Sequence, residues 1–125
     1  MDQRLIEICT RIPGYWYLAT PYSKYPEGLE MAFVEACRVA GHLIKIGVRV
    51  FSPIAHMHPV ARFCNIDPHD HAIWLPADRP IMDAACGLIV CKMPSWEISF
   101  GIAEEIKIFE AAGKPIEYME WPPGP

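Results

Sequence analysis

The chain has 125 residues, of which 52% are hydrophobic and 21% charged, and its formal net charge at pH 7 is −4. This composition predicts a single globular domain over residues 1–125, and the scattered Lys and Arg residues offer no basic surface to a nucleic acid. We therefore expect a small-molecule or protein partner. A charged N-terminus, no long apolar run and five cysteines without a CxxC pair predict a cytoplasmic protein with reduced thiols and without a signal peptide or membrane span.

The first half of the chain predicts two strands with a helix between them. Residues 15–19 (YWYLA) form a short aromatic and aliphatic run that a Thr-Pro pair ends, which indicates a buried strand. Residues 28–46 carry apolar side chains at helical spacing and are followed by a glycine that can cap a helix. Residues 48–51 (VRVF) predict the second strand.

The middle of the chain is rich in proline and histidine. We interpret residues 53–76 as a long loop with only a short helical turn at 71–75. Long loops often carry function, so this segment is the candidate substrate lid. Residues 78–86 predict a short helix, and residues 87–91 (GLIVC) predict a fully buried strand.

The last part of the chain completes an alternating pattern. Residues 97–112 predict a long helix, and a Gly-Lys-Pro turn leads into a fourth strand at 116–119. Strands and helices in alternation predict an α/β protein with a three-layer flavodoxin-like (Rossmann-like) parallel sheet of four to five strands and helices on both faces. In such sheets ligands bind at the carboxyl ends of the strands, so we expect the functional site at that edge.

Two adjacent glutamates in the final predicted helix fall on opposite faces. At about 100° per residue, Glu105 lies inside the apolar arc, whereas Glu104 lies on the polar arc. A carboxylate on a buried face either bonds to a backbone amide or takes part in chemistry. Glu105 is therefore a candidate catalytic residue.

Three patterns occur together along the chain. They are the string YLATPY at 17–22, Asp78 ahead of the helix that leads to GLIVC, and W-x-x-S-x-G-x-x-x-E at 96–105 before Gly-Lys-Pro. Together they resemble the nucleoside 2-deoxyribosyltransferase superfamily, which includes deoxynucleoside 5'-monophosphate N-glycosidases. The resemblance spans residues 15–119. It implies a homo-oligomer that cleaves or exchanges the N-glycosidic bond of (deoxy)nucleosides or nucleotides.

By position, the resemblance implies that Glu105 is the nucleophile, Asp78 the catalytic aspartate and Tyr17 the tyrosine of the first strand. The chain departs from the superfamily pattern at Gly87, where an aspartate is common, and at the loop containing Ser23, which lacks the Gly-Ser-x-Arg phosphate motif. We expect substrate to contact a further set of residues near the strand ends: Ser99, Gly101, Pro21, Tyr22, His56 and Trp96.

The chemistry of the reaction fits these residue types. Cleaving an N-glycosidic bond needs a carboxylate near the anomeric carbon and a proton donor for the leaving base. Glu105 and Asp78 can take these roles, and the Tyr17 hydroxyl can orient Glu105. Plain structural interpretations stay open, because Asp78 and Ser99 can cap helices and Tyr17 and Trp96 can pack in the core.

Two alternatives come from other features. The segment at 56–71 gathers possible zinc ligands, namely His56, His58, Cys64, Asp67, His69, Asp70 and His71. Their spacing matches no standard zinc pattern, so we expect no metal, and the absence of GxGxxG and of a cofactor-lysine signature predicts no cofactor. A non-catalytic nucleotide-binding or sensor domain with the same fold is the alternative to an enzyme.

Overall fold

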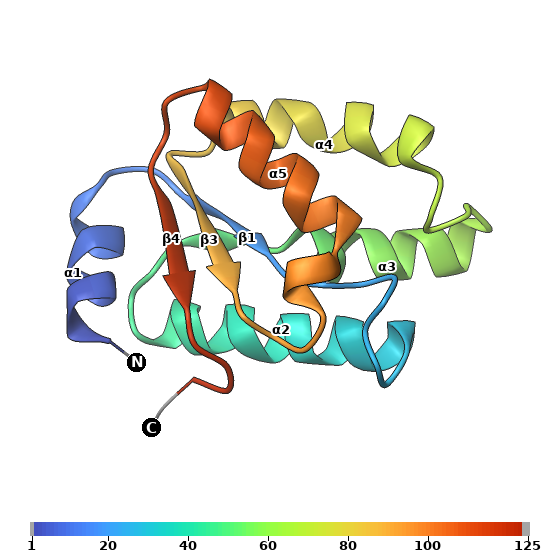
Figure 1. Ribbon diagram of the computed structural model, residues 1–125, viewed down its shortest axis with the longest axis horizontal. Coiled ribbons are helices and arrows are strands. Elements are labelled where there is room, and N and C mark those ends of the chain that lie inside the picture. The colour runs from blue at the N-terminus through green and yellow to red at the C-terminus, as the bar shows by residue number, and fades with distance from the viewer. Residues whose placement is uncertain (1, 124–125) are drawn as a thin grey trace.

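A four-stranded, all-parallel sheet forms the centre of the structure, a computed structural model that describes residues 2–123 (Figure 1). The strand order is β2 (Val50–Phe51), β1 (Trp16–Ala19), β3 (Gly87–Cys91) and β4 (Ile116–Met119). The helices between and before the strands are α1 (Gln3–Arg11), α2 (Leu29–Lys45), α3 (Pro53–Cys64), α4 (His71–Ala84), the short 3-10 helix η1 (Trp96–Ile98) and α5 (Phe100–Ala111). The predicted α/β class and parallel sheet are confirmed.

Helices cover both faces of the sheet, which gives the predicted three layers. Side chains alternate along β1, so Trp16 and Leu18 pack toward α1, α2 and α3, whereas Tyr17 and Ala19 pack toward α4 and α5. Figure 1 shows α2 on one side of the strands and α4 with α5 on the other. Because both faces of the sheet are buried, β1 and β3 lack the polar residue at every second position that a half-exposed strand shows.

Close packing at the start of β3 leaves no room for a side chain at Gly87. A Cβ atom on Gly87 would lie 2.4 Å from the Trp16 ring and 2.8 Å from the Pro115 carbonyl oxygen. The indole of Trp16 also donates a hydrogen bond from Nε1 to the carbonyl oxygen of Cys9 in α1, at 3.1 Å. The first strand, the third strand and α1 therefore meet around one buried tryptophan.

The interpretation of residues 53–76 as a loop is wrong, because this segment forms α3 and the first part of α4. Ser52 caps α3 by accepting a hydrogen bond from the amide of Ala55 at 3.1 Å, and Asn65 ends it in the left-handed conformation. Prolines at 59, 76 and 80 lie inside these helices. Each interior proline costs about 3 kcal/mol, so the pattern suggested a loop, but packing of buried side chains such as Met57 and Met82 overrides that cost.

Other elements also differ from the prediction. Asp78 is not a helix cap, since it lies in the middle of α4 and Asp70 provides the cap by accepting from the amide of Ala72. The last long helix begins at Phe100 rather than at 97, after η1. Helix α1, with Leu5 and Cys9 buried, had no counterpart in the sequence prediction. No helix within residues 2–123 is long and apolar enough to cross a membrane.

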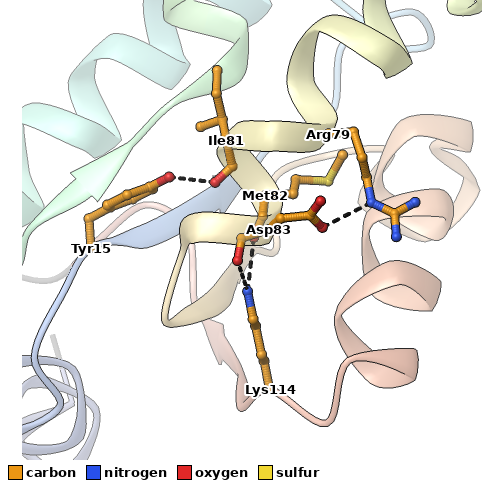
Figure 2. Close-up of polar contacts among 6 residues, drawn as sticks. All are labelled: Tyr15, Arg79, Ile81, Met82, Asp83 and Lys114. Atoms are coloured by element: carbon orange, nitrogen blue, oxygen red, sulfur yellow. Dashed lines mark hydrogen bonds and ion pairs between the residues drawn. The ribbon is translucent and has the colours of Figure 1, made fainter.

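The C-terminal end of α4 is fixed by side chains from elsewhere in the chain (Figure 2). Lys114 donates from Nζ to the carbonyl oxygens of Met82 (3.1 Å) and Asp83 (2.6 Å), and Tyr15 donates to the carbonyl of Ile81. The last carbonyls of a helix have no partner within the helix and carry partial negative charge, so a lysine there both bonds and neutralises them. The lysine of the Gly-Lys-Pro turn thus ties α4 to the chain between α5 and β4.

We predict that Lys114→Met lowers the free energy of unfolding by about 1–2 kcal/mol, because two charge-assisted hydrogen bonds to the end of α4 are lost. Urea denaturation followed by circular dichroism measures this change. Lys107→Met is the matched control, since Lys107 makes only an exposed ion pair with Glu104 at 3.3 Å, and it should change stability by less than about 0.5 kcal/mol. Equal effects of the two substitutions would contradict the capping role.

Candidate functional site

A cavity of about 120 Å³ opens at the carboxyl edge of the sheet. The loop after β1 and the α5 cap Ser99 reach it, and α3, α4 and α5 form its walls. Its lining residues are Tyr17, Thr20, Tyr22, Ser23, Lys24, Pro53, Ile54, Met57, Pro68, His71, Trp74, Leu75, Asp78, Met82, Ser99, Phe100, Gly101 and Glu105. The position agrees with the rule that parallel sheets bind ligands where their strands end.

Two carboxyl groups from different helices face this cavity. Glu105 shares the inner face of α5 with the buried residues Ile102 and Phe109, while Asp78 comes from the middle of α4. Protein surrounds most of the Glu105 side chain, and the part that stays accessible lines the cavity. Its neighbour Glu104 points away and pairs with Lys107. The predicted inward direction of Glu105 is confirmed, whereas Glu104 lies outside this cavity with only 29% of its side chain exposed.

The surroundings make both carboxyl groups hold their protons more strongly than usual. Burial raises the pKa of Glu105 well above its ordinary value, the negative charge of Asp78 raises it further, and the Tyr17 hydroxyl lowers it. Burial raises the pKa of Asp78 from 3.8 to about 6, against the opposing effect of the nearby His56. Two interacting carboxyls with shifted pKa values are typical of sites that move protons.

Tyr17 lies beneath the carboxyl groups on the central strand β1. Its side chain is fully buried. Burial is the largest cause that raises the pKa of Tyr17, and the negative charges of Glu105 and Asp78 raise it further, so the hydroxyl stays protonated. The hydroxyl lies close enough to Glu105 to lower that group's pKa. It is not aligned as a hydrogen bond in this structure, and it has no other partner in the described part of the chain. Tyr17 thus places a protonated hydroxyl beside the Glu105 carboxyl.

The structure brings most of the other predicted site residues to the same cavity. Ser99 caps α5 by accepting from the amide of Ile102 at 3.2 Å, and Ser99, Gly101 and Tyr22 all line the cavity. A Cβ on Gly101 would meet only the Ser99 hydroxyl, at 3.9 Å. No contact within the chain therefore requires glycine at this position, and its missing side chain leaves space at the cavity wall.

Three predicted substrate-binding residues do not line the cavity. Pro21 is buried beside it, and His56 is exposed on α3, where it affects the cavity only through its charge on Asp78. Trp96 packs edge-on against Tyr118, with ring centroids 5.9 Å apart. The tryptophan that does line the cavity is Trp74 of α4.

Several lining residues escaped the sequence analysis. Thr20 has a buried hydroxyl without a partner among residues 2–123, and Lys24 follows it in the loop after β1. His71 and Phe100 pack against each other at the cavity, with ring centroids 4.5 Å apart and planes tilted by 42°. Lys24 could have been found from its place after a predicted strand. Trp74 and His71 lie in the helical turn predicted at 71–75, but they were interpreted as a packing residue and a possible zinc ligand rather than as part of the cavity.

The histidine-rich segment does not form a metal cluster. In the region from residue 2 to residue 123, no three His, Cys, Asp or Glu side chains come together in a way that could hold a metal ion. The side chains of α3 and α4 point in different directions, so His56 faces solvent while His58 contacts Tyr22 and Glu30.

We predict that Asp78→Asn and Glu105→Gln raise stability at pH 8, on the order of 1 kcal/mol each, and that this gain disappears near pH 4. The folded state raises the pKa of both acids. Their contribution to stability is therefore fully present below the unfolded pKa and is lost as the pH rises through the folded pKa, which is about 6 for Asp78. Urea denaturation at the two pH values measures the difference.

The control for this measurement is Asp83→Asn on the same helix. Asp83 is 61% exposed and pairs with Arg79, so its removal should change stability by less than about 0.5 kcal/mol. A loss of stability at pH 8 in Asp78→Asn or Glu105→Gln would mean that these carboxyls serve the fold rather than the cavity.

Comparison with known proteins places this fold and cavity in a family. No curated protein matches the chain. Residues 14–121, from just before β1 to just after β4, match the family described as a domain of unknown function, DUF1937. The match includes every residue that lines the cavity. Because it covers most of the sequence, the chain belongs to the DUF1937 family.

Proposed function

We propose that this protein cleaves or exchanges the N-glycosidic bond of a (deoxy)nucleoside or nucleotide. The observation that carries the proposal is the pair of coupled carboxyls, Asp78 and Glu105, that face one small cavity above the Tyr17 hydroxyl. Glycosidic cleavage uses two carboxyl groups with different proton affinities, one to meet the anomeric carbon and one to serve the leaving group. The resemblance to the nucleoside 2-deoxyribosyltransferase superfamily assigns the same two positions.

In this proposal the pair shares one proton near neutral pH. In the free protein the more strongly raised pKa of Glu105 favours that carboxyl as the position of the proton. Substrate binding must therefore move the proton to Asp78, so that Glu105 attacks the anomeric carbon as a carboxylate while the bond to the base breaks. Asp78 passes its proton to the departing base, which leaves a glycosyl ester on Glu105 and a charged Asp78. Water or a second base then attacks the ester, Asp78 takes the proton of that nucleophile, and Glu105 departs as a carboxylate.

Tyr17 has a supporting role in this scheme. Its pKa is raised, so its hydroxyl keeps its proton and can donate a hydrogen bond to Glu105. Such a bond favours the ionised form of the carboxyl and so opposes the effect of burial. It would hold one oxygen of Glu105 and leave the other free to attack.

We predict that Glu105→Ala removes at least about 1000-fold of any glycosidic activity, whereas Glu104→Ala stays within about threefold, because only Glu105 faces the cavity. The assay incubates the protein with a panel of nucleosides and nucleotides, with and without an acceptor base, and measures released or exchanged base by chromatography. Similar losses in both variants would remove Glu105 from the mechanism. Binding without turnover across the panel would favour the alternative of a nucleotide-binding or sensor domain.

The covalent step gives a separate prediction. A 2-fluoro sugar analogue of an active substrate should accumulate as an ester, because fluorine destabilises the oxocarbenium-like centre that the second step requires. Mass spectrometry should detect one added sugar per chain, on the peptide that contains Glu105, and none in Glu105→Ala. Turnover of the normal substrate without any trapped ester would instead favour direct attack by water with Glu105 as the base.

A further inference from the structure

A second polar network borders the cavity on the side of α3. The Tyr22 hydroxyl lies 2.6 Å from Nδ1 of His58, and Nε2 of the same ring lies 2.8 Å from Oε2 of Glu30. Phe33 stacks on the imidazole, with ring centroids 4.6 Å apart and planes 21° apart. Tyr22 and Glu30 come from the loop after β1 and the first turn of α2, so His58 joins three segments through both ring nitrogens.

The partners of the ring determine where its proton lies. A glutamate carboxylate can only accept, so Nε2 of His58 must carry the hydrogen that bonds to Glu30. In the neutral imidazole the other nitrogen, Nδ1, then has only a lone pair, and the Tyr22 hydroxyl must donate to it. The hydrogen of that hydroxyl is therefore directed at His58 and is not free for a ligand.

This arrangement gives one end of the cavity a hydrogen-bond polarity, meaning that it offers an acceptor rather than a donor. Tyr22 lines the cavity and is 7% exposed, and its oxygen keeps lone pairs after its hydrogen is used. We propose that His58 is a positioning residue that makes the Tyr22 oxygen a hydrogen-bond acceptor, so that the cavity selects ligands with an N–H or O–H donor at this end. The choice of nucleosides as probes rests on the proposed function, but the polarity itself does not.

The same network predicts how pH changes the selection. When His58 gains a proton, Nδ1 also becomes a donor, and the Tyr22 oxygen accepts from it and turns its own hydrogen toward the cavity. The charged and titratable groups around the ring are Tyr22, Glu30, Arg62, which lies 3.8 Å from Glu30, and His69, whose ring is 6.3 Å from that of Tyr22. The preference for donors should therefore weaken or reverse in acid.

The test compares ligand pairs in which an exocyclic amino group, a donor, is replaced by an oxygen that can only accept. Affinities of 2'-deoxycytidine against 2'-deoxyuridine, 2'-deoxyadenosine against 2'-deoxyinosine, and aniline against anisole are measured by titration at pH 8 and pH 5.5. We expect the amino compound of each pair to bind roughly 10-fold more tightly at pH 8, the value of one hydrogen bond to a buried group, and to lose that advantage at pH 5.5. Nitrogen NMR of His58 should show the hydrogen on Nε2.

Variants separate this role from a structural one. Tyr22→Phe and His58→Phe should abolish the difference within each pair, and His58→Phe keeps an aromatic ring against Phe33. Tyr25→Phe is the control, since Tyr25 is buried in the same loop but does not line the cavity, and it should keep the preference. If Tyr22→Phe fails to fold, the affinities of His58→Phe and the pH comparison in the unmodified protein test whether His58 positions the Tyr22 hydroxyl.

The outcomes for the two proposals differ. A hydrogen on Nδ1 of His58, equal affinities within the pairs, or a preference that is unchanged at pH 5.5 would each overturn the role of His58. Preference for aniline without binding of any nucleoside would support the polarity of the cavity and contradict the proposed function.

Discussion

The structure depends on the requirement that both faces of a parallel sheet be buried. Side chains alternate along β1 and β3, so each strand divides its residues between two helical layers. Trp16 goes to the layer of α1 and α2, and the next residue, Tyr17, goes to the layer of α4 and α5. A shift of one residue in the register of β1 would exchange the two. The same constraint that builds the core therefore decides which side of the sheet carries the hydroxyl beneath Asp78 and Glu105.

The cavity is built from groups that the core would not otherwise retain. Glu105 interrupts the inner face of α5 between Ile102 and Phe109, and Asp78 interrupts the inner side of α4. Apolar residues at these positions would contribute burial, whereas the carboxyls cost solvation and repel each other. A fold that keeps two such groups around a space of about 120 Å³ sacrifices stability at one edge. That cost is the physical reason for connecting the site with function rather than with folding.

Sequence reasoning predicted well those parts whose signal is local. The apolar run of β3, the Gly-Lys-Pro turn before β4 and the helical period of α2 and α5 set the positions of these elements, and the period of α5 alone directs Glu105 inward. The method failed where local signals oppose tertiary packing. Three interior prolines made α3 and α4 resemble a loop, so the middle of α4 was mistaken for a helix start at Asp78. The pairing of His58 with Tyr22 and Glu30 joins segments up to 36 residues apart, and no pattern in the sequence indicates it.

Helix α1 has a consequence for the behaviour of the protein in solution. It lies outside the residues that match the DUF1937 family, yet it buries Leu5 and Cys9 and supplies the carbonyl that binds the indole of Trp16. Arg4 also pairs, at 3.3 Å, with Glu117 on the edge strand β4, beside which α1 lies in Figure 1. Without α1, the four strands would remain, but an apolar surface would be exposed next to an unpaired strand edge. Removal of α1 would therefore bring exposed apolar surface and an open strand edge together, a combination that favours association between molecules.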